Sequence, residues 1–316
     1  MSSTTTATEV EDDTTSSSTR SSTLSRSARW ARRAPLLPAL IFVIILTQVP
    51  MIVTLIISFT NWVAFRPDDR GFAGLDNYRA VFGDPEARSA VFVTIILTVT
   101  VVLASLLIGL GIALLLDRQF FGRGIVRTMM ITPFLIVPVA AALVWKHALY
   151  NPSYGLFNGI LRLLFGENAP TRDWISSNAL IAIEVSLIWQ WTPFMMLILL
   201  AGLQSRPMDV VEAARIDGAN AWQIFFHMTL PHLRPYIELA GLLGAIYVVQ
   251  NFDHVFTLTA GALGTANLPY HIYQTLLSAQ DYGEASAAGV VTVFGTIIIA
   301  MFALKTAFSL FQEESR

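Results

Sequence analysis

The order of apolar and polar stretches along the chain predicts six membrane-spanning helices. About 20 helical residues cross the hydrocarbon core of a bilayer, so an apolar run of that length indicates a span. Such runs lie at about residues 36–62, 90–116, 129–149, 179–203, 236–258 and 290–311. The third run contains Pro133 and Pro138, and proline interrupts a helix because it lacks a backbone N–H. The pattern therefore predicts an all-α polytopic membrane protein.

The segments outside the spans divide the chain into a long core and two tails. Residues 1–34 are rich in Ser and Thr and poor in bulky apolar side chains, which is typical of a disordered tail. We expect the six-span domain at 35–311 and a second short tail at 312–316. Between spans, we expect a short helix within 61–88, an amphipathic helix near 156–165, and an irregular, re-entrant or external segment at 259–289.

The positions of Lys and Arg indicate which side of the membrane each loop faces. If the N-terminus is cytoplasmic, 13 of the 20 Lys and Arg residues fall on the inner side and 7 on the outer side. An excess of basic residues in cytoplasmic loops is the usual arrangement. We therefore expect both termini to be cytoplasmic, with the polar segment 205–235 on the same side.

Composition excludes several classes of function. Of the 316 residues 54% are hydrophobic and 13% charged, and the net charge of −2 gives no reason to expect nucleic acid as a partner. The chain has no cysteine, which removes disulfides and thiolate chemistry. Its five histidines are scattered without metal-ligand spacing, so we expect no metal site. No G-x-x-x-x-G-K-[ST] motif is present, so ATP, if it is used, binds to another chain.

Residues 205–235 read as two short helices between two spans. Ser205 is expected to cap the first helix, with Pro207 in its first turn. Gly218 suits the left-handed position that closes a helix, and Asn220 can cap the second helix. Pro231 is expected to end that second helix. The exposed acidic and apolar side chains of this element suggest that it docks a partner.

The same element carries a recognisable motif. Glu212-Ala213-Ala214 is followed by three residues, Gly218, a nine-residue spacer, Met228, one residue and Leu230-Pro231. This pattern resembles the EAA loop of ABC-importer permeases. The resemblance covers about residues 35–311 and looks closest to the maltose type, and residues 251–274 resemble its sugar and polyol members. It implies a type I permease architecture in a prokaryotic plasma (inner) membrane.

The resemblance also implies how the protein assembles. This chain would form half of a translocation pathway with a second permease subunit, two ATPase subunits and an extracytoplasmic solute-binding protein. ATP and Mg would bind to the ATPases, so the chain itself is expected to carry no cofactor and no catalytic residue. The residues expected to couple to an ATPase are Glu212, Ala213, Ala214, Asp217 and Gly218. Trp222 and Phe225 would pack back on the bundle. The alternative is an amphipathic hairpin at the lipid headgroups.

Polar and aromatic side chains at membrane depth are candidates for the solute pathway. Trp189 and Trp191 lie near the centre of the fourth span, and aromatic faces with nearby amides suit a sugar or polyol. In the fifth span, Tyr247, Gln250 and Asp253 share a helical face, while Asn251 does not. The alternatives are tryptophans that only pack and a polar network that only holds the bundle together.

Two other classes of function stay open at this point. Glu184 and Asp253, both at membrane depth, could be the ion sites of a secondary transporter. Glu184 could equally be paired with a polar neighbour and have no transport role. A membrane-embedded enzyme is disfavoured because the sequence contains no catalytic constellation.

Overall fold

The computed structural model describes residues 37–166 and 169–313, and the predicted tail at 1–34 lies outside them. The chain divides into two compact units, residues 1–52 and 53–316. The first unit holds most of helix α2 (Leu37–Ile57), which matches the first predicted span. This helix of 21 residues carries no charged side chain, so its length and its chemistry both suit a bilayer.

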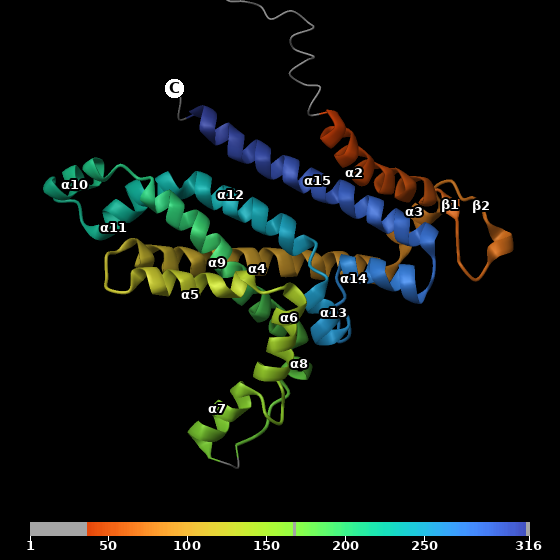
Figure 1. Ribbon diagram of the computed structural model, residues 1–316, viewed down its shortest axis with the longest axis horizontal. Helices are drawn as coiled ribbons and strands as arrows, with labels where there is room; N and C mark the ends of the chain where they lie inside the picture. The colour runs from red at the N-terminus through yellow and green to blue at the C-terminus, as the bar shows by residue number, and fades with distance from the viewer. Residues whose placement is uncertain (1–36, 167–168, 314–316) are drawn as a thin grey trace, which may run out of the picture. The chain divides into compact units, whose positions relative to one another are not determined.

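The second unit is built from long helices, with shorter helices at both of their ends (Figure 1). In chain order the α-helices are α3 (Asp76–Gly83), α4 (Pro85–Asp117), α5 (Arg123–Leu135), α6 (Pro138–Leu143), α7 (Leu156–Phe165), α8 (Trp174–Ser177), α9 (Ala179–Gln204), α10 (Met208–Ile216), α11 (Ala221–Ile224), α12 (Leu230–Val249), α13 (Asp253–Thr259), α14 (Leu268–Tyr273) and α15 (Tyr282–Glu313). The other elements are the 3-10 turn η2 (Pro67–Asp69), the π-helical segments η3 (Val144–Leu149), η4 (Phe225–Thr229) and η5 (Gln274–Ser278), and the strands β1 (Thr60–Asn61) and β2 (Gly71–Phe72), which pair antiparallel.

These helices account for the six predicted spans, although two of the spans are broken. Within the described residues, α2, α4 and α9 are each long and apolar enough to cross a membrane alone. Two more spans are bent pairs: α5 meets Pro138–Leu149 at 96°, and Ala221–Val249 meets α13 at 49°. Helix α15, with 32 residues, covers the sixth. The expected all-α polytopic architecture is confirmed.

The third span bends at one proline, not at two. Pro133 lies inside α5, whereas the chain turns at Ile136 and Val137, immediately before Pro138. Val137 is extended (φ −56°, ψ 133°) because a residue that precedes proline avoids the helical region. The turn exposes backbone groups, and the buried Gln190 of α9 donates its amide Nε2 to the Ile136 carbonyl at 3.0 Å. The expectation that both prolines interrupt the helix is therefore wrong for Pro133.

Helix α9 is the centre of the second unit, and small residues bring its neighbours close to it. A Cβ on Gly109 of α4 would stand 3.0 Å from the Met196 nitrogen of α9. A Cβ on Gly244 of α12 would lie inside the side chain of Met195. Such contacts are typical of membrane bundles, where close approach of backbones replaces the hydrophobic effect as the source of helix association. Met195, Met196, Leu199 and Leu200 are fully buried at this junction.

The end of the unit that carries the β1–β2 hairpin is more ordered than the sequence suggests. Residues 259–289 were expected to be irregular, but α14, η5 and the first turns of α15 make most of this segment helical. Tyr282 at the start of α15 donates its N–H to the Trp62 carbonyl at 2.9 Å. The expected helices within 61–88 and near 156–165 are α3 and α7, so both predictions are confirmed.

Candidate coupling element and solute pathway

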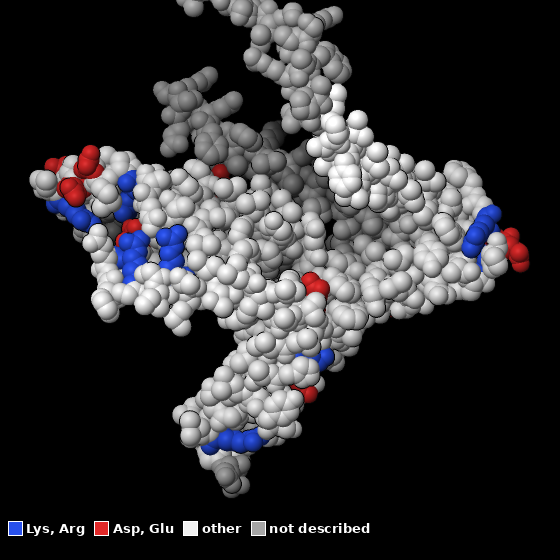
Figure 2. Space-filling view, in the orientation of Figure 1, with Lys and Arg blue, Asp and Glu red and all other residues white. Residues whose placement is uncertain are grey.

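The first candidate site is the segment of α10, α11 and η4 that connects α9 to α12, and it is called the coupling element below. Figure 1 shows α10 and α11 at the end of the bundle where α4 ends and α5 begins, opposite the β1–β2 hairpin. On the face in Figure 2, acidic and basic side chains gather over that end, while the long helices between the two ends are almost uncharged. This is the charge distribution of a membrane-spanning bundle with a polar element at one face.

The turn between α10 and α11 has a complete set of capping interactions. Gly218 is left-handed (φ 90°), its N–H reaches the Arg215 carbonyl at 3.1 Å, and the Ala219 N–H reaches the Ala214 carbonyl at 2.9 Å. These two bonds define a Schellman motif, which needs a residue without a Cβ at its left-handed position. Asn220 then opens α11 in a capping box with Gln223. The predicted positions of Gly218 at the left-handed helix end and of Asn220 at the helix cap are confirmed.

Two other predictions about this element are wrong. Ser205 does not cap α10, whose N-cap is Pro207. Its hydroxyl instead bonds to the Gly202 carbonyl at 2.9 Å and lies 2.8 Å from the Tyr236 hydroxyl. Pro231 does not end a helix either, because the chain runs on from η4 into α12. The wide π-helical turns, with the Leu230 N–H bonded to the Phe225 carbonyl, make room for the proline ring.

The exposed surface of this element carries the motif residues. Glu212, Ala213, Asp217 and Gly218 are exposed, and Ala214 is half-buried. Large apolar side chains lie on the same element: Ile216 is 86% exposed and Trp222 is 72% exposed. Within the described residues no ion pair involves Glu212 or Asp217. Exposed apolar side chains beside unpaired carboxylates are typical of a surface that binds another protein.

Trp222 does not pack back on the bundle as expected. Its ring stacks on Phe226, with centroids 5.8 Å apart, on the exposed side of α11 and η4. The residues that anchor the element are Val211 and Ile224, which are 1% and 8% exposed. Val211 directly precedes Glu212 in α10, yet Val211 is buried while Glu212 and Ala213 are exposed, so the anchor and the motif occupy different faces.

The second candidate site is an aromatic group where α9, α5 and α12 meet. Trp191 of α9 stacks on Tyr247 of α12, with ring centroids 5.2 Å apart and an interplanar angle of 25°. Phe134 and Phe194 extend this group, at 5.7 and 5.9 Å from Trp191. Tyr247 is 54% exposed, so the group presents a flat aromatic face at the bundle surface.

The structure separates Trp189 from this group. Each residue of an α-helix is rotated by about 100° from the one before it, so two positions make about 200°. Trp189 and Trp191 therefore project from nearly opposite sides of α9. Trp189 packs edge-on against Trp145 at 5.8 Å, within a cluster that includes Tyr150 and Phe157. Its surroundings are those of a packing residue.

The predicted stripe of Tyr247, Gln250 and Asp253 does not form, because the fifth span breaks between them. Helix α12 ends at Val249 and α13 begins at Asp253, so a helical spacing no longer relates these residues. Gln250 is exposed, and Asn251 and Asp253 are half-buried. The Asn251 carbonyl accepts a hydrogen bond from the buried Asn267 side chain, which also caps α14. Asn267 therefore fixes the break, a role that the sequence did not reveal.

Glu184 is paired with a neighbouring helix. Thr100 of α4 donates its hydroxyl to Glu184 Oε1 at 2.8 Å. This contact corresponds to the alternative in which Glu184 bonds to a polar neighbour at membrane depth.

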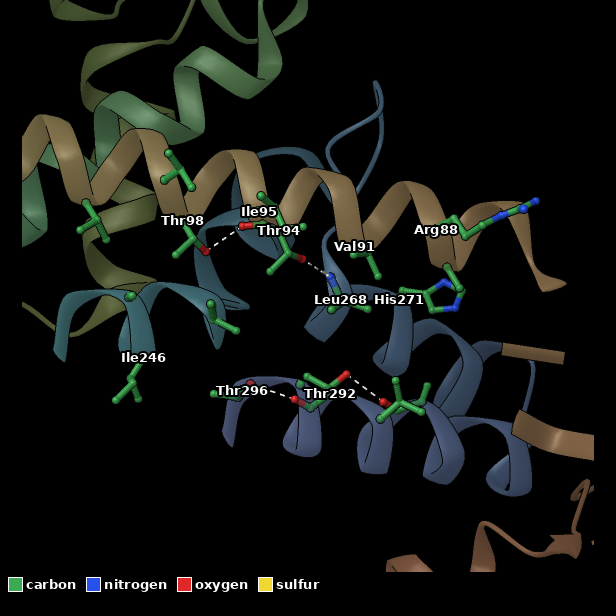
Figure 3. Close-up of a pocket in the computed structure, with 18 of the residues that line it drawn as sticks. Arg88, Val91, Thr94, Ile95, Thr98, Ile246, Leu268, His271, Thr292 and Thr296 are labelled. Atoms are coloured by element: carbon green, nitrogen blue, oxygen red, sulfur yellow. Dashed lines mark hydrogen bonds between the residues drawn. The ribbon is translucent and has the colours of Figure 1, made fainter. Parts of the chain in front are cut away.

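A cavity of about 670 Å³ lies between α4, α12, α14 and α15, and the sequence did not predict it (Figure 3). Most of its lining is apolar. Thr98, Thr292 and Thr296 line it as well, but each donates its hydroxyl to a carbonyl one turn earlier in its own helix. Arg88 and His271 also line it, but most of the cavity wall is apolar, so it offers few hydrogen-bonding groups to a hydroxylated solute. We therefore place the solute candidates at the aromatic group and not in this cavity.

The fold and both sites agree with one class of protein, an integral membrane component of a transport system. A family described as "Binding-protein-dependent transport system inner membrane component" matches residues 105–312, and the chain belongs to that family. It is therefore a permease subunit of a binding-protein-dependent ABC transport system.

Named relatives cover most of the chain. The probable ABC transporter permease protein y4oQ of Sinorhizobium fredii is 38% identical over 84% of this chain and 85% of its own length. The trehalose/maltose transport system permease protein MalF of Thermococcus litoralis is 36% identical over 81% of this chain and 86% of its own. Among solved structures, a chain of a bacterial ABC transporter involved in alginate import has a TM-score of 0.77 at 23% identity, covering 90% of this chain and 96% of that one. That likeness supports the fold.

Proposed function

We propose that this chain is the permease subunit of an ATP-driven importer for a sugar or a polyol. It forms half of the translocation pathway and moves between two packings of its helices. The energy comes from ATP hydrolysis on partner chains, because the sequence contains no phosphate-binding loop. The partners in the proposal are a second permease subunit, two ATPase subunits and an extracytoplasmic solute-binding protein.

The observation that carries the proposal is the exposed turn that ends α10. Its Schellman motif holds the backbone of Glu212 to Gly218 in one geometry, with the motif residues facing away from the bundle. The exposed Ile216 gives the same surface an apolar centre. A rigid turn with carboxylates around an apolar side chain suits insertion into a cleft of an ATPase subunit. Glu212, Ala213, Ala214, Asp217 and Gly218 are the proposed contacts.

The cargo class is supported by the aromatic group at Trp191 and Tyr247. Aromatic faces bind the C–H faces of sugar rings, and amides and carboxylates bind their hydroxyl groups. Gln250, Asn251 and Asp253 at the break of the fifth span are the proposed hydrogen-bonding partners. Trp189 is the weakest pathway candidate because it packs with Trp145. Relatives are named as trehalose/maltose and trehalose permeases, which agrees with a carbohydrate cargo.

The side of the membrane is part of the proposal. With α10 and α11 at the cytoplasmic face, α5 also begins on that side, and the basic residues Arg118, Arg123 and Arg127 lie there as the positive-inside rule favours. The β1–β2 hairpin and α14 then lie on the outer side, where the solute-binding protein would dock.

The test is reconstitution of the chain with its partner subunits in proteoliposomes. Uptake of radiolabelled sugar should require ATP inside and the solute-binding protein outside. Glu212→Ala should weaken ATPase binding and lower uptake while the protein still inserts. Asp76→Ala, at an exposed pair on the other end of the bundle, is the matched control for ATPase binding. Uptake that persists without ATP and stops when the ion gradient is collapsed would instead support an ion-coupled carrier, which the Thr100–Glu184 bond does not favour.

A further inference from the structure

One arginine joins the coupling element to three helices. Arg206 follows α9, and its side chain is 13% exposed. Its Nη1 donates to the Thr229 hydroxyl at 2.6 Å, and its Nη2 lies 3.6 Å from Asp117 Oδ2. Asp117 is the last residue of α4, and Thr229 is the last residue of η4, directly before α12. The guanidinium therefore lies where α4, α9 and α12 meet.

The charges at this contact suit each other. A carboxylate at the C-terminus of a helix lies at the negative end of the helix dipole, which is unfavourable without a cation nearby. No basic residue occupies the last turn of α4, so Arg206 supplies the positive charge for Asp117. The buried Thr229 hydroxyl, in a residue that is 3% exposed, accepts the second bond. A planar guanidinium can hold both partners at once, whereas the ammonium of lysine lacks this fork.

A second contact, centred on Ser205, also joins the two ends of the coupling element. The Ser205 hydroxyl lies 2.8 Å from the Tyr236 hydroxyl and 3.2 Å from His232 Nε2. Tyr236 of α12 packs directly on Gly202 of α9, where a Cβ would stand 2.6 Å from the ring. The entry to the coupling element, at Ser205 and Arg206, is thus bonded to its exit, at Thr229 and the first turns of α12.

We propose that Arg206 is the positioning residue that passes movement of the coupling element to α4 and α12. The inference rests on the proposed function. Because the entry and the exit are held together, a displacement of α10 and α11 cannot be absorbed by opening the element at its base. It is carried into the end of α9, through Thr229 into α12, and through Asp117 into α4. The Arg206 side chain is engaged with Thr229 and Asp117, so the effect proposed for it is on coupling.

The test measures sugar uptake and ATP hydrolysis together in proteoliposomes that hold the whole transporter. Arg206→Lys should lower the ratio of sugar imported to ATP hydrolysed by about fivefold or more, the lower end of typical couplings between sites. Arg234→Lys is the matched control, since Arg234 lies near the same face but pairs with Glu238 at the surface, with 59% of its side chain exposed. Its ratio should stay at the wild-type value.

A charge exchange separates coupling from simple loss of structure. Arg206→Asp should lose coupling, and the double variant Asp117→Arg with Arg206→Asp should recover a substantial part of the ratio. The inference is overturned if the Arg206→Lys ratio equals that of wild type, or if uptake and hydrolysis fall in proportion. It is also overturned if the exchanged pair recovers nothing while inserting and assembling normally. Failure of the proposed function looks different, because the wild-type complex itself would then show no ATP-dependent uptake.

Discussion

The exposed turn at Glu212–Gly218, here called the docking turn, is the proposed contact with the ATPase subunit. Replacing Gly218 by alanine tests this turn without removing any side chain. Gly218 has φ 90°, and a Cβ added there would meet no atom within 4 Å. The substitution therefore creates no clash with neighbouring residues. Its effect arises from the backbone alone, because an L-residue in the left-handed region places its Cβ too close to the adjacent carbonyl oxygen.

The magnitude follows from that strain. A left-handed L-residue costs about 1–2 kcal/mol relative to glycine. The turn can relieve the strain by giving up the Ala219–Ala214 and Gly218–Arg215 hydrogen bonds, which shifts α11 relative to α10. An energy of about 1–2 kcal/mol corresponds to a change of roughly 5- to 30-fold in the population of the docked geometry. We therefore expect Gly218→Ala to weaken ATPase binding and to lower uptake by a factor in that range.

The assay is titration of the detergent-solubilised permease with its ATPase subunit, followed by uptake in proteoliposomes. Gly122→Ala is the matched control, since Gly122 is also left-handed (φ 82°, ψ 6°) with open space around it, but it opens α5. Gly218→Asn should be milder, because asparagine tolerates the left-handed region. Full ATPase affinity in Gly218→Ala, or an equal loss in Gly122→Ala, would refute the reasoning.

Three further predictions address packing, cargo and energy source. Gly202→Ala should lower the free energy of unfolding by about 1–3 kcal/mol, because its Cβ would overlap the Tyr236 ring; a thermal denaturation midpoint equal to that of wild type would contradict this. Trp191→Ala should raise the apparent KM for sugar roughly 3- to 10-fold, because it removes the aromatic face that stacks on Tyr247. Trp189→Ala should instead lower the thermal denaturation midpoint and leave KM unchanged, because Trp189 packs against Trp145. Glu184→Gln should keep uptake within about twofold of wild type, because the amide oxygen still accepts the Thr100 hydroxyl; abolished uptake at normal insertion would revive the ion-coupled alternative.

The spans and the docking turn could be predicted from sequence because local chemistry determines them. An apolar run of span length is stable inside a membrane, and a glycine with an asparagine two residues later, as in Gly218 and Asn220, is a strong signal for a helix end and a new start. The motif residues Glu212 to Gly218 were therefore found where the structure exposes them. Residue spacing also gave the short helices α3 and α7.

The remaining features depend on residues that are far apart in the sequence. Pro133 and Pro138 look alike in sequence, but the chain turns only before Pro138, where the side chain of the distant Gln190 bonds to the Ile136 carbonyl. Tyr247 and Asp253 were expected on one helical face, but the break held by Asn267 removes that geometry. Arg206 reads as an ordinary loop arginine, since its partners lie 89 residues before it and 23 residues after it.

The Gln190 contact also has a consequence for the order in which the protein is made. The sharp bend before Pro138 leaves backbone groups that lipid cannot solvate, and a side chain that is translated more than 50 residues later satisfies one of them. We therefore expect the third segment to become stable in the bilayer only when the fourth lies beside it. A nascent chain arrested before Gln190 should then still be held by the insertion machinery.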